Sequence, residues 1–476
     1  MKCLLVLPPN NTGASTGGGP SKATNIASGL CPPLGLIHVA AYAEQLKSID
    51  ITVIDCRVDW RGIPQFEEKL KALTPDVVGI SVMTFTLYES CEVAKAVKRV
   101  LPTTKIVMGG PHVAIYPGET ICLPYVDYVI YGEGEFAVHD LLQALLAGDS
   151  PEGIPGVITK ETDISRITIQ AVENLNSLLP PARHLIDTSH YRSILNQADR
   201  TTTMMSSRGC PGQCIFCDRP QWGNKFRKRS ATSVFNEVKD CYDKFDIKEF
   251  VFYDDTFTID KQRVLDLCQL LADAKLPITW SVCARIDSVN EQMIKALARA
   301  GCNRIKFGVE TGSARLQKHI RKNLDLSRIH EVITMTAKSG IEIFGYFMIG
   351  LPSETHEEIE MTINLMCSLP FDYVQVAIFT PYPGTFAYKQ LLEERKYGND
   401  YWREFATNPH PDFIPPVLED NFTRAELECI RRRANRRFYF RPSYILKRLS
   451  KIRNIRELCD KGWMAVQLLR ESFFDA

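Results

Sequence analysis

Three cysteines in the middle of the chain have the type and spacing needed to hold a reactive metal centre. Cys210, Cys214 and Cys217 fall within eight residues, with no fourth cysteine or histidine close by. A structural zinc site is normally closed by four protein ligands, whereas a [4Fe-4S] cluster held by three thiolates keeps one iron open for a further ligand. The spacing therefore favours an iron-sulfur cluster with an open, catalytic iron over structural zinc.

The composition describes an ordinary globular chain. Its 476 residues correspond to about two to three domains. Lys+Arg 57 against Asp+Glu 56 gives a net charge of +1, so no overall electrostatic bias toward nucleic acid is expected. The cysteines outside the motif are scattered singly and no signal peptide precedes them, which favours reduced thiols in the cytoplasm. The longest uncharged stretch, residues 23–43, contains Pro32 and Pro33 and is a poor transmembrane candidate.

Residues 1–150 alternate short apolar runs with amphipathic segments, which predicts a parallel sheet covered by helices. The expected strands are residues 3–7, 51–54, 77–82, 105–108 and 128–131, and the expected helices are 34–46, 66–73, 88–100 and 136–146. This pattern is typical of a doubly wound, Rossmann-like domain, which binds ligands beyond the carboxyl ends of its strands.

Small and turn-forming residues gather at those strand ends. They include the glycine-rich residues 13–19, Ser81 to Thr84, Gly109-Gly110-Pro111-His112 and Gly132-Glu133-Gly134-Glu135. Glycines there allow a ligand to approach the backbone closely, although tight strand-to-helix turns would also use them. No G-x-G-x-x-G follows the first strand, so an ordinary dinucleotide site is not favoured.

Residues 151–200 are rich in proline, glycine and polar residues and are expected to form a linker with one small hairpin. In residues 201–390 the alternation returns as six βα units, which predicts a partial TIM-type barrel. Strands are expected near 202–207, 249–253, 278–283, 304–309, 342–349 and 373–379, with helices near 231–242, 261–274, 291–300, 326–339 and 356–367. The cysteines follow the first of these strands, at the end of the barrel where active sites lie.

Residues 391–476 are expected to be helical and basic. Residues 424–456 hold twelve Lys and Arg, with Leu446, Leu449 and Ile452 at helical spacing. Such a helix is suited to peripheral contact with an anionic membrane, a carrier or a substrate tail. The alternative is a solvated helix that packs as a terminal cap.

The C-x3-C-x2-C motif resembles the radical S-adenosylmethionine (SAM) superfamily, and motifs at the later strand ends extend the resemblance. These motifs are residues 253–257, 283–287, 308–313, 348–352 and 380–385. The resemblance implies that Phe216 contacts adenine, that Asp254 and Asp255 lie near the methionyl ammonium, and that Arg285 lies near the carboxylate. It also implies Glu310 near the ribose hydroxyls and Tyr382 in the SAM site. These pairings are chemically sound, since carboxylates accept from ammonium and hydroxyl groups and Arg pairs with carboxylates.

In that superfamily the reduced cluster transfers an electron to SAM, and the resulting 5′-deoxyadenosyl radical abstracts a hydrogen atom from the substrate. The resemblance therefore implies an electron donor such as flavodoxin or ferredoxin. The C-terminal region has no further C-x2-C pairs, so auxiliary clusters are not expected.

A doubly wound domain ahead of such a barrel resembles the cobalamin-binding class of the superfamily, which includes radical methylases and the anaerobic Mg-protoporphyrin ester cyclase. The resemblance implies cobalamin contacts from the strand-end residues Ser81, Thr84, Gly109, Gly110, His112, Gly132, Glu133 and Gly134. The Asp-x-His-x-x-Gly motif that supplies a lower axial histidine is absent: Asp55 to Gly62 contains no histidine. Cobalamin is then expected without that ligand. His112 is either a corrin contact or a polar loop residue.

The function expected from this resemblance is radical methylation, in which one SAM methylates cobalamin and another generates the radical that activates an unreactive carbon. The substrate is expected to be a small molecule, a lipid or another natural product. Cyclisation or rearrangement on the same architecture is the alternative. A cobalamin or metal sensor without catalysis is the alternative from another class.

Overall fold

The N-terminal domain is built on a parallel sheet, as its pattern of apolar runs predicts. The computed structural model describes residues 1–10, 30–58, 62–167, 171–191, 195, 198, 200–218, 222–451, 459, 462, 463, 466 and 467. Five strands pair in parallel in the order β2-β1-β3-β4-β5, and a short antiparallel strand, β6, lies at the edge. The strands are β1 (Lys2–Leu7), β2 (Asp50–Asp55), β3 (Val77–Ser81), β4 (Lys105–Gly109), β5 (Tyr128–Ile130) and β6 (Val157–Ile158). This is the order of a flavodoxin-like doubly wound fold, so ligands are expected beyond the β1 and β3 ends.

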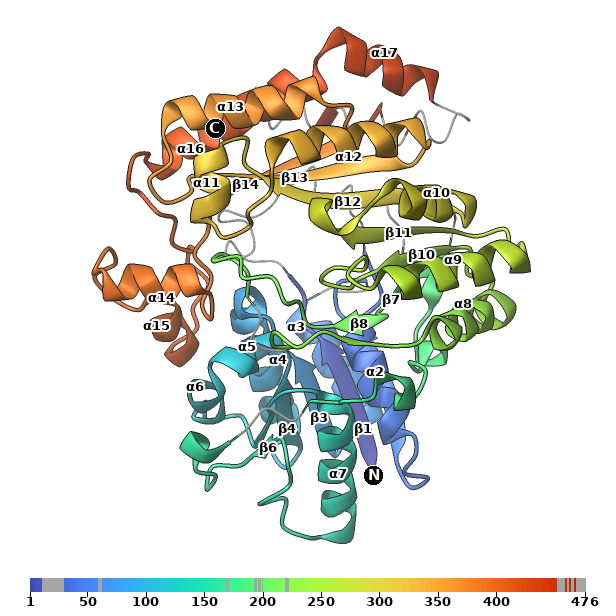
Figure 1. Ribbon diagram of the computed structural model, residues 1–476. Coiled ribbons are helices and arrows are strands. Elements are labelled where there is room, and N and C mark those ends of the chain that lie inside the picture. The colour runs from blue at the N-terminus through green and yellow to red at the C-terminus, as the bar shows by residue number, and fades with distance from the viewer. Residues whose placement is uncertain are drawn as a thin grey trace.

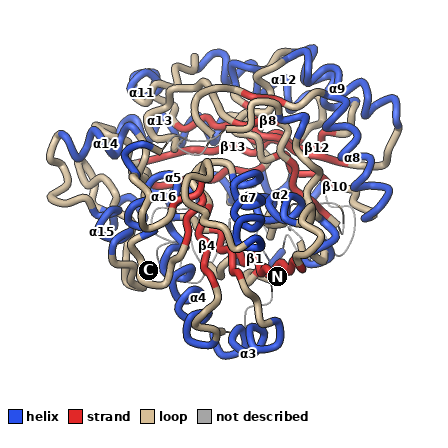
Figure 2. The backbone as a smooth tube through the Cα atoms, turned by 90° about the horizontal axis from the view of Figure 1, so that it is seen from below, coloured by secondary structure: helices blue, strands red, loops and turns tan. Residues whose placement is uncertain are grey.

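Helices lie on both faces of this sheet (Figures 1 and 2), and alternating strand residues pack against opposite faces. Leu5 packs with helices α2 (Leu34–Ala43) and α7 (Gly134–Ala147), whereas Leu4 and Val6 pack with α3 (Ile63–Leu73) and α4 (Leu87–Val100). Two short helices, α5 (Pro111–Ile115) and α6 (Pro117–Ile121), follow β4. The glycine-rich residues 13–19 lie outside the described residues.

Residues 151–200 connect the two sheets mostly through turns. The described residues of this segment contain β6 and the 3-10 turns η3 (Ile164–Arg166), η4 (Leu175–Ser177), η5 (Arg183–Leu185) and η6 (Thr188–His190). The expected hairpin is not among them. Instead β6 pairs with β5, because a single short strand can complete an existing sheet edge without a partner of its own.

The second sheet is an open barrel of six parallel strands in the order β14-β13-β12-β11-β10-β7. Its strands are β7 (Thr201–Met204), β10 (Glu249–Phe252), β11 (Thr279–Ala284), β12 (Cys302–Glu310), β13 (Glu342–Ile349) and β14 (Tyr373–Ile378). The helices are α8 (Ala231–Phe245), α9 (Lys261–Ala274), α10 (Glu291–Arg299), α11 (Ala314–His319), α12 (Leu326–Lys338) and α13 (His356–Ser368). The predicted α/β fold with a six-unit partial barrel is therefore confirmed. A small hairpin, β8 (Ser207–Arg208) with β9 (Arg227–Lys228), flanks the cysteine loop.

The C-terminal region packs on both domains. Helices α14 (Phe386–Glu393) and α15 (Tyr401–Thr407) bring Trp402 and Phe405 into the apolar core of the N-terminal domain. Helix α16 (Arg424–Tyr439) buries Leu427 and Phe438 in the barrel core and is followed by α17 (Pro442–Ser450). Helix α16 thus fits the alternative of a packed cap, while Ile452 lies outside the described residues. No described helix has both the length and the apolar character needed to cross a bilayer.

Candidate active site

The cysteine loop begins directly after β8, between the two domains (Figure 1). Gly209 has φ +83°, and a Cβ atom there would collide with the Lys225 carbonyl oxygen, so the turn into the loop requires glycine. Cys210 is half-buried, Cys214 is buried and Cys217 is exposed, and none of the three is in a disulfide. The three cysteines therefore differ in solvent exposure, and they are not all enclosed in the protein core.

Backbone hydrogen bonds fix this loop to the barrel. The Ile215 amide donates to the Ile320 carbonyl (3.1 Å), and the Ala387 amide donates to the Ile215 carbonyl (2.9 Å). Phe216 packs with the apolar side chains around Leu316 and Ile320, at the strand-end side of the barrel. Such anchoring holds the thiols in place before any metal binds.

Hydrogen-bond donors lie beside two of the three thiols. Arg285 Nη1 lies 3.7 Å from Cys214 Sγ, and Thr256 Oγ1 lies 3.8 Å from Cys210 Sγ. Iron-sulfur clusters are held by cysteine thiolates, and Arg285 provides a positive charge beside the loop that would carry them. Within the described ranges, no group of three His, Cys, Asp or Glu side chains is arranged to hold a single metal ion. Three thiols without a fourth protein ligand fit a cluster with an open iron.

The structure separates the roles of the two adjacent aspartates after β10. Asp254 is buried and accepts hydrogen bonds from the Ser206 amide (2.7 Å) and from the Ser206 and Ser207 hydroxyls (both 2.5 Å). Asp255 is exposed, and desolvation by the surrounding protein, followed by the charge of Asp254, raises its pKa, while a hydrogen bond from the Gly209 amide opposes that rise. Asp254 therefore joins β7 to β10, and Asp255 is the carboxylate left available to a ligand.

Arg285 and Glu310 lie at the same end of the barrel. Arg285 donates to Asp287 through Nε (2.9 Å) and Nη2 (2.7 Å), and Nη2 also donates to the Lys322 carbonyl (3.1 Å). Lys322 Nζ donates to Glu310 Oε1 (2.5 Å) and lies 6.0 Å from the centre of the Phe216 ring. Three of the predicted residues, Asp255, Arg285 and Glu310, thus lie close to the cysteine loop, which itself carries Phe216.

Glu310 adopts an uncommon backbone conformation. Its φ is +69°, and the register of β12 against β13 shifts between Gly308 and Glu310. A residue other than glycine in the left-handed region costs about 1–3 kcal/mol, and such strain concentrates at functional sites. Here the strained residue is the one whose carboxylate pairs with Lys322 beside the cysteine loop.

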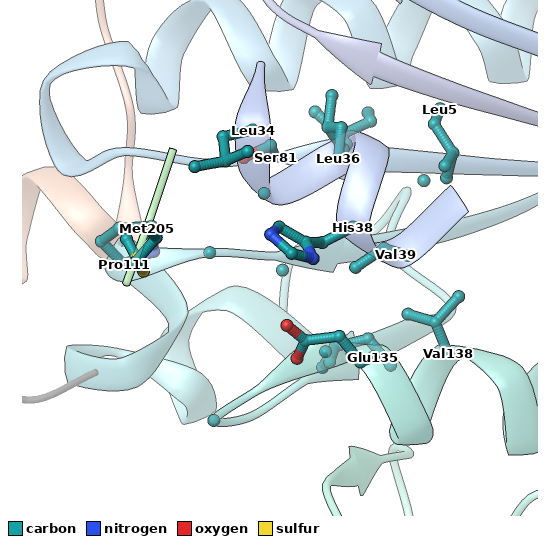
Figure 3. Close-up of a pocket in the computed structure, with 18 of the residues that line it drawn as sticks. Leu5, Leu34, Leu36, His38, Val39, Ser81, Pro111, Glu135, Val138 and Met205 are labelled. Atoms are coloured by element: carbon teal, nitrogen blue, oxygen red, sulfur yellow. The ribbon is translucent and has the colours of Figure 1, made fainter. Parts of the chain in front are cut away.

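A cavity of about 370 Å³ lies between α2, α7 and the carboxyl ends of the first sheet (Figure 3). Its walls include the predicted residues Ser81, Gly109, Gly110, Gly132 and Gly134. They also include Thr203, Met205, Trp222 and Tyr253 from the barrel side. A cavity of this size accommodates a drug-sized group, so it fits part of cobalamin rather than the whole molecule.

Gly110 shows why this edge needs small residues. Its φ is +108°, and a Cβ atom there would lie 2.9 Å from the Val82 carbonyl oxygen. Any larger residue would strain the turn that opens the cavity, so the glycine has a packing reason beyond turn propensity.

Three residues predicted to contact cobalamin, Thr84, His112 and Glu133, do not line this cavity, and Tyr382, predicted in the SAM site, packs elsewhere. His112 is fully buried, its Nδ1 atom lies 3.2 Å from Thr84 Oγ1, and burial lowers its pKa to about 3. Glu133 is buried in ion pairs, and the ring of Tyr382 lies 5.6 Å from that of Trp402, centre to centre. The roles assigned to Thr84, His112, Glu133 and Tyr382 stay predictions, since the structure places these side chains in packing positions.

A buried ion-pair network joins the cysteine loop to the cavity, and sequence reasoning missed it. Arg208 donates through Nη1 to Glu133 and through Nη2 to Glu135. Arg227 Nη2 lies 2.5 Å from Glu133 Oε1, and all four side chains are at most 5% exposed. Arg208 also lies over the Trp222 ring, 4.6 Å from its centre. The one sequence feature that pointed to this network is the position of Arg208 directly before the cysteine motif.

His38 faces Glu135 across the cavity (Figure 3). Burial lowers the pKa of His38 to about 4, against the charge of Glu135, so the imidazole is neutral at physiological pH. Its Nδ1 atom has no hydrogen-bond partner among the described residues. Burial opposes ionisation of Glu135, but Arg208 lowers its pKa overall. The cavity therefore contains a neutral imidazole and a carboxylate, which add two polar groups to a largely apolar wall.

Comparison with known proteins supports both domains. The family model of the radical SAM superfamily matches residues 204–366, and that of the B12 binding domain matches residues 23–142. An uncharacterised methyltransferase of Pyrococcus horikoshii is 32% identical over 455 residues, which are 94% of each chain. The anaerobic magnesium-protoporphyrin IX monomethyl ester cyclase of Rubrivivax gelatinosus is 23% identical over 88% of this chain and 75% of its own.

Among solved structures, the cobalamin-dependent SAM radical enzyme OxsB, with aqua-cobalamin and SAM bound, superposes with a TM-score of 0.72. It is 18% identical and covers 99% of this chain and 72% of its own. The superposition extends over both domains and the C-terminal region, so the whole architecture is shared.

Proposed function

This chain belongs to the radical SAM superfamily, among the members that carry a B12 binding domain, and from that membership we propose that it is a cobalamin-dependent methyltransferase. The methyl group would pass to an unactivated carbon of a small-molecule, lipid or other natural-product substrate. The relative from Pyrococcus horikoshii supports this proposal through its methyltransferase name. The single observation that carries it is the cavity that residues of both domains line, beside the cysteine loop.

The residues present fit the cofactors. Cys210, Cys214 and Cys217 would hold the cluster, and Asp255 with Glu310 would bind SAM. Residues of the cavity wall would hold part of the cobalamin. When bound, the cluster and SAM supply radical chemistry, and cobalamin supplies a transferable methyl group.

The chain's own groups then bind and orient. Asp255 is suited to accept from the SAM ammonium, because its exposed carboxylate has no side-chain partner among the described hydrogen bonds and lies beside the Gly209 amide at the start of the cysteine loop. Glu310 is suited to accept from ribose hydroxyls while Lys322 fixes its position. Trp222, over Arg208, closes the cavity wall next to the cysteine loop and helps to exclude water from it.

The state of the cysteines is consistent with a reducing environment. None of the fifteen cysteines is in a disulfide, which supports a reducing compartment such as the cytoplasm and an electron donor of the flavodoxin or ferredoxin type. Peripheral membrane contact through the basic C-terminal helices would be a further property of this proposal.

Radical cyclisation is the second candidate function. The cyclase from Rubrivivax gelatinosus favours it, at lower identity and over a smaller share of that protein. Both functions would use the cluster, SAM and the barrel. They differ in whether a methyl group is transferred to the substrate.

Anaerobic reconstitution tests the proposal. Iron content, the visible spectrum with and without hydroxocobalamin, and 5′-deoxyadenosine formation under reduction are measured on the wild type and on Cys214→Ala. We expect a cobalamin spectrum that changes on binding and reductant-dependent SAM cleavage, both in the wild type. Failure to bind cobalamin would refute methyl transfer from it, while retained SAM cleavage in C214A would refute the cluster assignment.

A further inference from the structure

The inner face of the barrel sheet carries an ammonium group without an acidic partner. Lys306 lies in β12 between Ile305 and Phe307, which both pack in the core beneath the helices. Because neighbouring strand residues point to opposite faces, Lys306 lies on the face turned toward the N-terminal domain (Figure 1). It is half-buried, and within the described part of the chain no hydrogen bond or ion pair involves its Nζ atom.

Two other cations near this inner face, Arg304 and Lys322, are both paired. Arg304, two residues earlier on the same face, has Nη2 2.7 Å from Glu342 Oε2 and 2.6 Å from the Leu195 carbonyl oxygen. Lys322, above the strand end, is paired with Glu310. A partly buried charge without a partner is costly, and folds usually pair it. Lys306 is therefore an exception that packing alone does not explain.

Polar side chains lie on the same inner face in the strands on both sides of Lys306. Cys283 is its direct partner in the register of β11 and β12. Tyr346 in β13 is level with Gly308, two residues beyond Lys306, and Gln375 lies beside Tyr346 in β14. Burial raises the pKa of the Cys283 thiol and the charge of Lys306 opposes that rise, which places the two groups close together. The Tyr346 hydroxyl and the Gln375 amide also have no hydrogen-bond partner among the described residues.

This set lies between the two expected cofactor sites. Tyr253, which lines the cavity of the N-terminal domain, donates its hydroxyl to Cys31 Sγ (3.1 Å). Burial raises the pKa of Tyr253 and the neighbouring groups Cys31, Cys283 and Tyr346 raise it further, so its phenol ring borders the inner-face set. Glu310 in turn acts on Tyr346 from the side of the cysteine loop. The inner-face set therefore has Tyr253 as a neighbour on the side of the cavity and Glu310 as a neighbour on the side of the cysteine loop.

We propose that Lys306, with Tyr346 and Gln375, binds an anionic group of the substrate, either a carboxylate or a phosphate. An ammonium, a hydroxyl and an amide supply three kinds of hydrogen-bond donor to the oxygens of such a group. The identification of this set as the substrate site rests on the proposed function. The inference assigns the chemical class of the substrate: an acid, anchored by its anionic end with its body toward Tyr253.

Protection of Cys283 from alkylation tests the proposal on the cluster-loaded enzyme without turnover. The protein is treated anaerobically with N-ethylmaleimide in rising concentrations of phenylphosphonate, benzoate or uncharged benzamide, and the Cys283 peptide is quantified by mass spectrometry. We expect protection by at least one of the two acids at concentrations at least about tenfold lower than by benzamide, since hydrogen bonds to charged groups are the stronger ones. The two acids distinguish a phosphate site from a carboxylate site.

Lys306→Met should abolish this preference, Lys306→Arg should retain it within about threefold, and Lys338→Met, at the exposed end of α12, should leave it unchanged. Far-UV circular dichroism and iron content establish that each variant is folded and loaded. Equal protection by benzamide and the acids, no protection by any probe, or an undiminished preference in K306M would overturn the proposal. Because no step requires cobalamin or SAM, these outcomes are independent of whether methyl transfer is confirmed.

Discussion

Replacing Arg208 with methionine should strongly destabilise the protein, because it removes the cation that joins the cysteine loop to the cavity wall. Breaking a buried ion pair by deleting one partner costs about 3–5 kcal/mol, since an uncompensated charge remains. Glu133 would keep Arg227, whose Nη2 atom lies 2.5 Å from Glu133 Oε1. Glu135 would be left with the neutral His38, so the loss should lie near about 3 kcal/mol.

The pH dependence follows from the sign of the Glu135 shift. In the wild type Arg208 lowers the pKa of Glu135 against its burial, so this carboxylate contributes stability above its unfolded pKa and loses it as the pH falls. Without Arg208 the burial effect remains and raises that pKa instead. The variant therefore gains stability relative to the wild type as the pH falls. The difference between their free energies of unfolding should become smaller from pH 7 to about pH 5.

Anaerobic guanidinium denaturation, followed by circular dichroism and tryptophan fluorescence, measures this loss. The double variant Arg208→Met/Glu135→Gln should recover at least half of it, because no unpaired carboxylate remains. Arg166→Met is the matched control, since Arg166 pairs with Asp163 on the surface with 86% of its side chain exposed. A loss in R208M no larger than in R166M would refute the reasoning.

Four further substitutions test separate parts of the account. Asp255→Asn should raise the SAM concentration needed for half-maximal 5′-deoxyadenosine formation at least about tenfold, since it removes a charged acceptor. Asp254→Asn should mainly lower the stability of the protein. The reverse pattern would exchange the roles of the two aspartates. Burial raises the pKa of Glu354 to about 7. As the pH rises from 4.5 to 7, the wild type should therefore lose up to about 3 kcal/mol of unfolding free energy. Glu354→Gln should make the unfolding free energy from urea titrations less dependent on pH over this range. Trp402 is fully buried and its indole donates to the Pro381 carbonyl (2.9 Å), so Trp402→Ala should cost about 3–5 kcal/mol; a change below about 1 kcal/mol in denaturant titrations would contradict the packing of α15.

Local patterns predicted the elements that position the site. The five apolar runs of the N-terminal domain and the six βα units of the barrel all exist, because buried parallel strands keep nearly continuous apolar runs that a single sequence reveals. Ser81 and Gly110 line the cavity for the same reason, since parallel strands deliver their carboxyl ends to one edge.

Long-range pairing was beyond the reach of sequence patterns. Arg208 and Glu135 are 73 residues apart, and nothing local marks them as partners. Asp254 and Asp255 are chemically equivalent neighbours, and only the serines of the first barrel strand end reveal which one is consumed by packing. His112 looked available as a loop residue, but the short helix α5 buries it against Thr84.

Transfer of a labelled methyl group tests the central claim most directly. The reconstituted enzyme is incubated anaerobically with methyl-labelled SAM, reductant and a cell extract, with and without cobalamin, and products are compared by mass together with 5′-deoxyadenosine. The account predicts a labelled product that requires cobalamin, and its loss in Cys214→Ala together with 5′-deoxyadenosine. A product that forms with 5′-deoxyadenosine but carries no label, or a labelled product that forms equally well without cobalamin, would contradict it.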